Sequence, residues 1–160
     1  MKNNEYRHGV EWPYHISCGG IVYRKTGTNT EIILLSRSEA DGDHYHLPKG
    51  TLIHNETIEA CALREVEEES GAKGNIAEYL GAISHDYVSP KNKLGVSKTI
   101  HYFAIQLSED SDSHDNEHDK KHWLSLSDAR NLLFETEPRK EEYLIVDRLI
   151  KYFEINKSSV

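Results

Sequence analysis

Two apolar segments near the start of the chain have the pattern of paired β-strands. Residues 15–24 (HISCGGIVYR) and 31–36 (EIILLS) are short and rich in β-branched side chains, which strands favour. The residues between them, 25–30, include Gly27 and are typical of a turn. We therefore expect two strands joined by a turn, followed by a polar loop over residues 39–46.

A helical period follows from Thr57 onward. Ile58, Ala62 and Val66 recur at four-residue intervals, so their side chains share one face of a helix. Thr57 is a good N-cap residue, and Gly71 suits the left-handed conformation in which many helices end. The pattern predicts one amphipathic helix between Thr57 and Gly71.

Two further apolar segments predict a second pair of strands. Residues 77–88 and 98–106 are rich in aromatic and β-branched side chains. Residues 89–97 are polar and contain a proline and a glycine, so we expect them to form the loop between these strands.

The last third of the chain predicts two helices. Ser125 with Asp128 has the form of a capping box and opens a short helix through Leu133. Residues 140–153 place apolar side chains at helical spacings and predict an amphipathic helix. Because strands and helices interleave without a repeat or a linker, we expect a single α/β domain over residues 1–160.

Length and composition narrow the class of protein. A chain of 160 residues buries roughly 68–70% of the surface of its unfolded form, which supports a core without disulfide or metal staples. The longest aliphatic run, 32–35, is far short of the ~20 residues that span a bilayer, so we expect no membrane segment. Residues 1–10 lack the apolar stretch of a secretory signal, and Cys18 and Cys61 lie far apart. We therefore expect a cytoplasmic protein whose cysteines are reduced packing residues.

The net charge is −8, and its distribution matters more than its size. Residues 108–119 (SEDSDSHDNEHD) hold six acidic side chains and no Lys or Arg. A polar tract without aliphatic residues gains too little from burial to become ordered, so we expect a solvated surface loop. No net-basic face is left to displace the counterions of nucleic acid, which disfavours general nucleic-acid binding.

Four glutamates gather at the C-terminal end of the helix predicted after Thr57, where the helix dipole favours cations. A solvated acidic face is the ordinary interpretation of such a run. The spacing points elsewhere, because Glu65, Glu68 and Glu69 fall at i, i+3 and i+4 and share one face, whereas Glu67 points away. Converging carboxylates repel one another unless a cation lies among them, and an all-oxygen cluster suits Mg²⁺.

The same region carries a family resemblance. Residues 50–72 read GTLIHNETIEACALREVEEESGA, which resembles the Nudix box G-x5-E-x7-R-E-U-x-E-E-x-G-U. The matching positions are Gly50, Glu56, Arg64, Glu65, Val66, Glu68, Glu69 and Gly71. Ala72 is smaller than the Ile, Leu or Val that usually ends the box. On these residues the chain is identified as a member of the Nudix hydrolase family.

The resemblance implies a fold, a reaction and a cofactor. The fold would be an α/β/α sandwich with a mixed sheet between helices, and the reaction would be hydrolysis of a nucleoside diphosphate linked to another group. The cofactor would be Mg²⁺, with Mn²⁺ as a substitute, because pyrophosphate cleavage needs charge neutralised on the phosphate oxygens. The implied metal ligands are Glu65, Glu68, Glu69 and the backbone carbonyl of Lys49. Arg64 would orient the glutamates and Glu56 would hold Arg64, a pair that a purely structural salt bridge also explains.

One acidic residue outside the box is a candidate for the same site. Residues 117–123 (EHDKKHW) resemble the E-H-x4-W pattern of several Nudix branches, in which an acid precedes a strand that contains Trp. Glu117 is therefore a candidate additional metal ligand or general base. The alternative is that Glu117 is one of the six solvated acids of the tract.

Four residues carry the prediction of the substrate. The turn at 47–50 (LPKG) resembles that of diadenosine polyphosphate and diphosphoinositol polyphosphate hydrolases, and Tyr45 stands where the family has an aromatic residue. Lys49 in this turn would contact phosphate, unless it faces solvent. Tyr87 and Lys98 match positions at which the asymmetrical diadenosine tetraphosphate hydrolases stack a tyrosine on adenine and bring a basic group to phosphate. Strand packing is the alternative for Tyr87.

The resemblance implies a small phosphorylated nucleotide as partner, with diadenosine tetraphosphate cleaved to ATP and AMP as the best match. ADP-ribose, diphosphoinositol polyphosphates, oxidised nucleotides and the 5′ end of RNA stay open as substrates. A nucleotide-sensing module without turnover is the alternative from another class, and the intact box glutamates speak against it. No membrane, no protein partner and no nucleic acid other than an RNA 5′ end is expected.

Overall fold

The computed structural model describes residues 14–91, 93–112 and 119–157. Glu117 lies outside the described residues, so its role stays a prediction. The described elements follow in the order β1 (Tyr14–Thr26), β2 (Asn29–Glu39), β3 (Gly42–His46), β4 (Lys49–Thr51), α1 (Ile58–Ser70), β5 (Lys73–Val88), β6 (Gly95–Glu109), β7 (Lys120–Ser125), α2 (Leu126–Thr136), the 3₁₀ turn η1 (Pro138–Lys140) and α3 (Glu142–Lys157).

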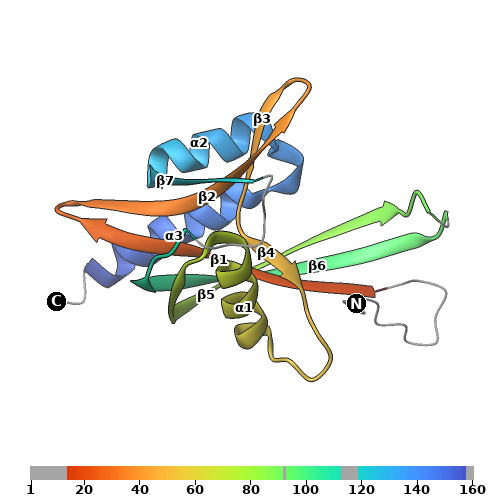
Figure 1. The fold of residues 1–160 in the computed structure, drawn as a ribbon, viewed down its shortest axis with the longest axis horizontal. Coiled ribbons are helices and arrows are strands. Elements are labelled where there is room, and N and C mark those ends of the chain that lie inside the picture. Colours follow the sequence, from red (N-terminus) through yellow and green to blue (C-terminus); the bar gives the residue numbers. More distant parts are fainter. Residues whose placement is uncertain (1–13, 92, 113–118, 158–160) are drawn as a thin grey trace.

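The strands of the described residues form one mixed sheet with the order β3-β2-β1-β6-β5 (Figure 1). Strand β1 runs parallel to β6 and antiparallel to β2, and the short strands β4 and β7 pair with β1 and β2. Helix α1 covers one face of this sheet, and helices α2 and α3 pack together against the other. The expected α/β/α sandwich is therefore confirmed.

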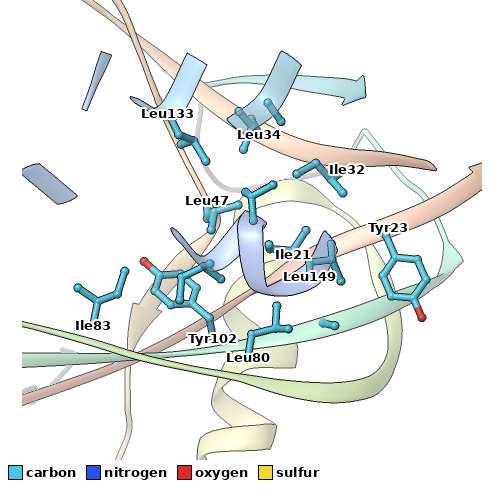
Figure 2. Packing of buried hydrophobic residues seen from close by; sticks show 14 of the residues in the cluster. Ile21, Tyr23, Ile32, Leu34, Leu47, Leu80, Ile83, Tyr102, Leu133 and Leu149 are labelled. Atoms are coloured by element: carbon cyan, nitrogen blue, oxygen red, sulfur yellow. The ribbon is translucent and has the colours of Figure 1, made fainter. Parts of the chain in front are cut away.

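The two faces of the sheet carry separate apolar clusters, because successive side chains of a strand point in opposite directions. On β2, Ile32 and Leu34 join the cluster under α2 and α3, whereas Ile33 and Leu35 join the cluster under α1. Figure 2 shows the first cluster, in which Tyr102 lies among side chains from the sheet and from α3. Both faces of β2 are buried, which explains its continuous aliphatic run.

The box helix forms as its sequence predicts. Helix α1 begins after Thr57, whose side chain accepts a hydrogen bond from the N–H of Ala60. It ends at Gly71, which has a φ of 76° and donates its N–H to the carbonyl of Glu67. Cys18 and Cys61 are buried free thiols in the cluster between α1 and the sheet, so the expectation that they are packing residues is confirmed.

Three expectations about elements were wrong. Residues 42–46 are strand β3, paired with β2 at the sheet edge, and their polar side chains concealed the strand because this edge is half exposed. The loop after β5 is shorter than expected, because β6 begins at Gly95. The last helix begins at Glu142 and leaves Leu144 41% exposed, since its buried face runs through Ile145 and Leu149.

Two further features complete the description of the fold. The far ends of β5 and β6 extend beyond the helices as a two-stranded arm (Figure 1). Within the described residues, no helix is both long enough and apolar enough to cross a membrane.

Candidate active site

Arg64 connects helix α1 to the segment that precedes it. Its Nε and Nη2 donate to the two carboxylate oxygens of Glu56 at 2.6 and 2.9 Å, and Nη2 also donates to the carbonyl of Thr51 at 3.0 Å. The hydrogen bond from Arg64 holds the pKa of Glu56 below its usual value. A bidentate pair of this kind fixes the plane of the guanidinium group. These contacts are those that the expected roles of Arg64 and Glu56 require.

The third nitrogen of the same guanidinium group faces the box glutamates. Nη1 of Arg64 donates to Glu65 Oε1 at 2.7 Å and to Glu68 Oε2 at 3.3 Å. Glu65 is 1% exposed, and its carboxylate lies against strand β4, where a Cβ atom at Gly50 would be 2.0 Å from Glu65 Oε2. Only glycine therefore fits at the first box position, because any side chain would displace this carboxylate.

Glu69 faces the turn before the box. Its Oε2 accepts the backbone N–H of Lys49 at 3.3 Å. Burial raises the pKa of Glu69 to about 7, because the N–H and the charge of Lys49 only partly offset the loss of solvent. Glu67, by contrast, is half exposed and pairs with Lys73 at 3.5 Å on the surface. The separation of Glu67 from the other three glutamates follows the helical spacing.

A small cavity of about 220 Å³ opens between the end of α1, strand β4 and the start of β7. Glu69 and Asp119 supply acidic groups to its wall, and Lys49, Lys98 and Lys140 supply basic ones. Acidic and basic side chains thus meet in one hollow, as a site for a cation and a phosphate requires.

Asp119 is a site residue that the sequence did not reveal. We expected it in a solvated loop, yet its side chain is fully buried, with Oδ1 accepting from Arg37 Nε at 3.2 Å and Oδ2 lying 3.1 Å from His46 Nε2. Its partners come from β2 and β3, which lie beside β7 only after folding. The sequence feature that could have identified Asp119 is its position just before the strand that contains Trp123.

A second cavity of about 590 Å³ adjoins the first and shares Lys49, Lys98 and Lys140 with it. Tyr87, which is 45% exposed, contributes its side chain from the end of β5, and Arg139 contributes from η1. The structure thus brings together three of the four residues expected to bind substrate. We call these two cavities, which share the three lysines in their walls, the hollow.

Tyr45 is not brought to either cavity. Its ring lies 5.4 Å from the ring of His122 and packs beside the cluster under α2. Its backbone N–H donates to Thr136 Oγ1 on α2 at 3.1 Å. These contacts are those of a packing residue, and the contact of Tyr45 with substrate stays a prediction.

Lys98 lines both cavities, and it is partly buried. Burial lowers its pKa, and the positive charges of Lys49 and Lys140 lower it further. Positive charges that lie close together repel one another, and three neighbouring lysines contrast with the net negative charge of the chain. A cluster of lysines in this place is therefore unfavourable unless an anion compensates it.

Glu142 is the second site residue that the sequence did not reveal. It begins α3, is 1% exposed, and its Oε2 accepts the backbone N–H of Leu47 at 2.8 Å. Its Oε1 accepts from Lys49 Nζ at 3.2 Å. The carboxylate therefore connects α3 to the turn that precedes the box.

A comparison with protein families shows the family of the chain. Residues 13–145 match the NUDIX domain, so the chain belongs to the Nudix family. It is 31% identical over 118 residues to Nudix hydrolase 21, chloroplastic, of Arabidopsis thaliana, covering 73% of this chain and 58% of that protein. It is 30% identical over 114 residues to human diphosphoinositol polyphosphate phosphohydrolase 3-alpha, covering 71% of this chain and 66% of that protein. The chain thus spans less than two-thirds of the plant relative.

Among solved structures, the fold resembles that of C. elegans Ap4A hydrolase. The TM-score is 0.60 at 22% sequence identity, and the match covers 86% of this chain and 97% of that chain. At this identity the likeness concerns the fold alone.

Proposed function

We propose that this chain is a Mg²⁺-dependent pyrophosphohydrolase acting on a nucleoside diphosphate linked to another group, with diadenosine tetraphosphate (Ap4A) as substrate. One observation carries the proposal: the cavity of about 220 Å³ has Glu69 of the box helix beside Lys49 and Lys98. Carboxylates suit a hard divalent cation, and lysines suit phosphate oxygens. Hydrolysis of a phosphoric anhydride requires both in one place.

The residues present fit Mg²⁺ by donor type. Glu65, Glu68 and Glu69 offer oxygen donors at one end of α1, and the raised pKa of Glu69, about 7, marks a buried carboxylate that a cation would stabilise. Among the described side chains, no three acidic, His or Cys groups already stand in a metal-holding arrangement. Arg64 donates to both Glu65 and Glu68, so it holds the direction of two of the carboxylates that would bind the ion. Mn²⁺ accepts the same donors.

The chain's own residues bind and orient the substrate. When bound, the cation supplies charge neutralisation at the pyrophosphate oxygens. Lys49 and Lys98 bind the phosphates as point charges, and Arg64 fixes the direction of Glu65 and Glu68. Glu56 in turn keeps Arg64 from rotating, through its two hydrogen bonds.

The adjoining cavity supports a dinucleoside polyphosphate. Tyr87 lines it together with Lys49 and Lys98, so one adenine can stack on the tyrosine while the phosphates pass the lysines into the smaller cavity. Stacking on an aromatic ring is worth about 1–3 kcal/mol per base. A solved protein of similar fold is an Ap4A hydrolase, which is consistent with this choice.

A diphosphoinositol polyphosphate is the second candidate. Four basic side chains, Lys49, Lys98, Arg139 and Lys140, line the larger cavity, more than a diphosphate alone needs. The human relative is named for this class of substrate. An inositol substrate carries no base and would not depend on Tyr87.

A substrate panel with Mg²⁺ tests the proposal. Ap4A, ADP-ribose, a diphosphoinositol polyphosphate and a 5′-triphosphorylated RNA are compared by kcat/KM, with phosphate-containing products separated by chromatography. We expect Ap4A to have the highest kcat/KM. Preferential turnover of another compound moves the chain to another branch of the family, and no turnover of any compound, with folded protein and Mg²⁺ present, contradicts the enzymatic proposal.

A further inference from the structure

Glu142 differs from the other acidic side chains of the larger cavity in its burial. That cavity has four basic side chains in its wall and three acidic ones, Asp86, Glu137 and Glu142. Asp86 and Glu137 lie nearer to solvent, and Glu137 pairs with His44 and Lys140. Glu142 alone of the three is buried, with a side chain only 2% exposed.

Glu142 acts electrostatically on both lysines that are expected to bind phosphate. It accepts from Lys49 Nζ at 3.2 Å, and the ammonium group is itself only 17% exposed. It also opposes the effect of Lys49 and Lys140 on the pKa of Lys98. This buried carboxylate therefore partly compensates a cluster of lysines that would otherwise repel one another.

We propose that Glu142 is a specificity-determining residue that limits how tightly the hollow binds a polyphosphate, by occupying Lys49 with a resident carboxylate. The inference rests on the proposed function and deepens it, because it concerns the number of phosphates that the site favours. An incoming phosphate competes with Glu142 for the ammonium group of Lys49. The negative charge of the phosphate is also repelled by the carboxylate of Glu142.

The proposal predicts a gain in affinity that depends on the charge of the ligand. Removing the charge of Glu142 leaves the lysines uncompensated, and the attraction to a ligand grows with the number of its negative charges. Binding should therefore tighten more for a four-phosphate substrate than for a two-phosphate one. The gain should also fall as salt is added, because screening weakens interactions with partly exposed charges.

The decisive variant is Glu142→Gln, which retains a hydrogen-bond acceptor for the N–H of Leu47 and nearly the same volume. Calorimetry with inorganic tripolyphosphate in EDTA measures binding without hydrolysis or metal. We expect the variant to bind about fivefold more tightly at low salt, the upper range for one screened charge pair. In turnover, the KM for Ap4A should fall, and the KM for ADP-ribose should fall less.

Two matched variants separate charge from structure. Glu142→Asp keeps the charge but shortens the side chain, and we expect its affinity for tripolyphosphate to stay within about twofold of the parent value. Glu135→Gln makes the same change in net charge at an exposed position on α2, and we expect no change in affinity. Thermal melts of all three variants report the structural contribution separately.

Several results would overturn the proposal. These are unchanged or weaker tripolyphosphate binding by Glu142→Gln, an equal gain in Glu135→Gln or Glu142→Asp, and failure of Glu142→Gln to fold despite the retained acceptor. Unchanged or weaker binding, or failure to fold, assigns Glu142 to a structural tie between α3 and the turn. An equal gain in Glu135→Gln reduces the effect to net charge, and an equal gain in Glu142→Asp reduces it to the length of the side chain. Because tripolyphosphate binding involves no catalysis, tighter binding with no turnover of Ap4A would keep this inference and contradict the proposed function.

Discussion

The acidic and basic halves of the candidate site are built in different ways. Most of the acidic half comes from a single helix and the segment before it, with Arg64 connecting Glu56, Glu65 and Glu68, and Asp119 is added from the start of β7. The basic half gathers Lys49 from β4, Lys98 from β6 and Lys140 from η1. Local spacing fixes the box glutamates, whereas the tertiary fold places Asp119 and assembles the basic half. We therefore expect catalysis to depend on the acidic half and substrate choice on the basic half.

The largest effect should come from the acidic half. Glu68→Gln or Glu69→Gln removes charge from the proposed cation site while keeping volume, and we expect kcat to fall ~10²-fold or more, as when a positioned electrostatic group is lost. Steady-state kinetics with the best panel substrate measures this. Glu67→Gln is the matched control on the same helix, because Glu67 faces solvent and should give the parent rate. If Glu68→Gln and Glu69→Gln both retain the kcat of the parent protein, the assignment of these glutamates as metal ligands is wrong.

Glu117 extends this test beyond the box. If Glu117 is a general base, Glu117→Gln should lower kcat by about 10²-fold with little change in KM, since the lost interaction belongs to the transition state. The pH dependence of kcat is the measurement. An unchanged pH profile and rate would return Glu117 to the solvated tract.

Arg64 tests whether the acidic half is also a structural unit. Arg64→Ala would leave the buried carboxylate of Glu65 and the carboxylate of Glu56 without their common partner. Breaking a buried pair by removing one member typically costs about 3–5 kcal/mol, and because Arg64 is partly exposed we expect about 3 kcal/mol lower free energy of unfolding. Urea denaturation followed by circular dichroism measures it. A loss below about 1 kcal/mol would mean that the network contributes only as a surface pair does.

Tyr87 tests the basic half. Tyr87→Ala should raise the KM for Ap4A about tenfold through lost adenine stacking, within the range of about 1–3 kcal/mol per base. A diphosphoinositol polyphosphate should keep its KM. Tyr79→Ala is the matched control, since Tyr79 lies on the same strand, is also 45% exposed and contacts His101 outside both cavities. If both substrates lose affinity equally, Tyr87 packs the strand and does not recognise a base.

The same contrast explains what could be predicted from the sequence. Helix α1 and its caps at Thr57 and Gly71 depend on neighbours within four residues, so pattern alone located them. Strand β3 was missed because an edge strand with polar side chains looks like a loop. Asp119 and Glu142 were missed because their partners lie more than 70 residues away along the chain, and burial decided their roles only after folding.

Analysis of the products of Ap4A, with and without Mg²⁺, tests the central claim most directly. We expect ATP and AMP in equal amounts, formed only when the cation is present, because water attacks the phosphorus that releases these two products. Two molecules of ADP, or an undiminished rate in EDTA, would contradict the assignment of this site as an asymmetrically cleaving, metal-dependent hydrolase.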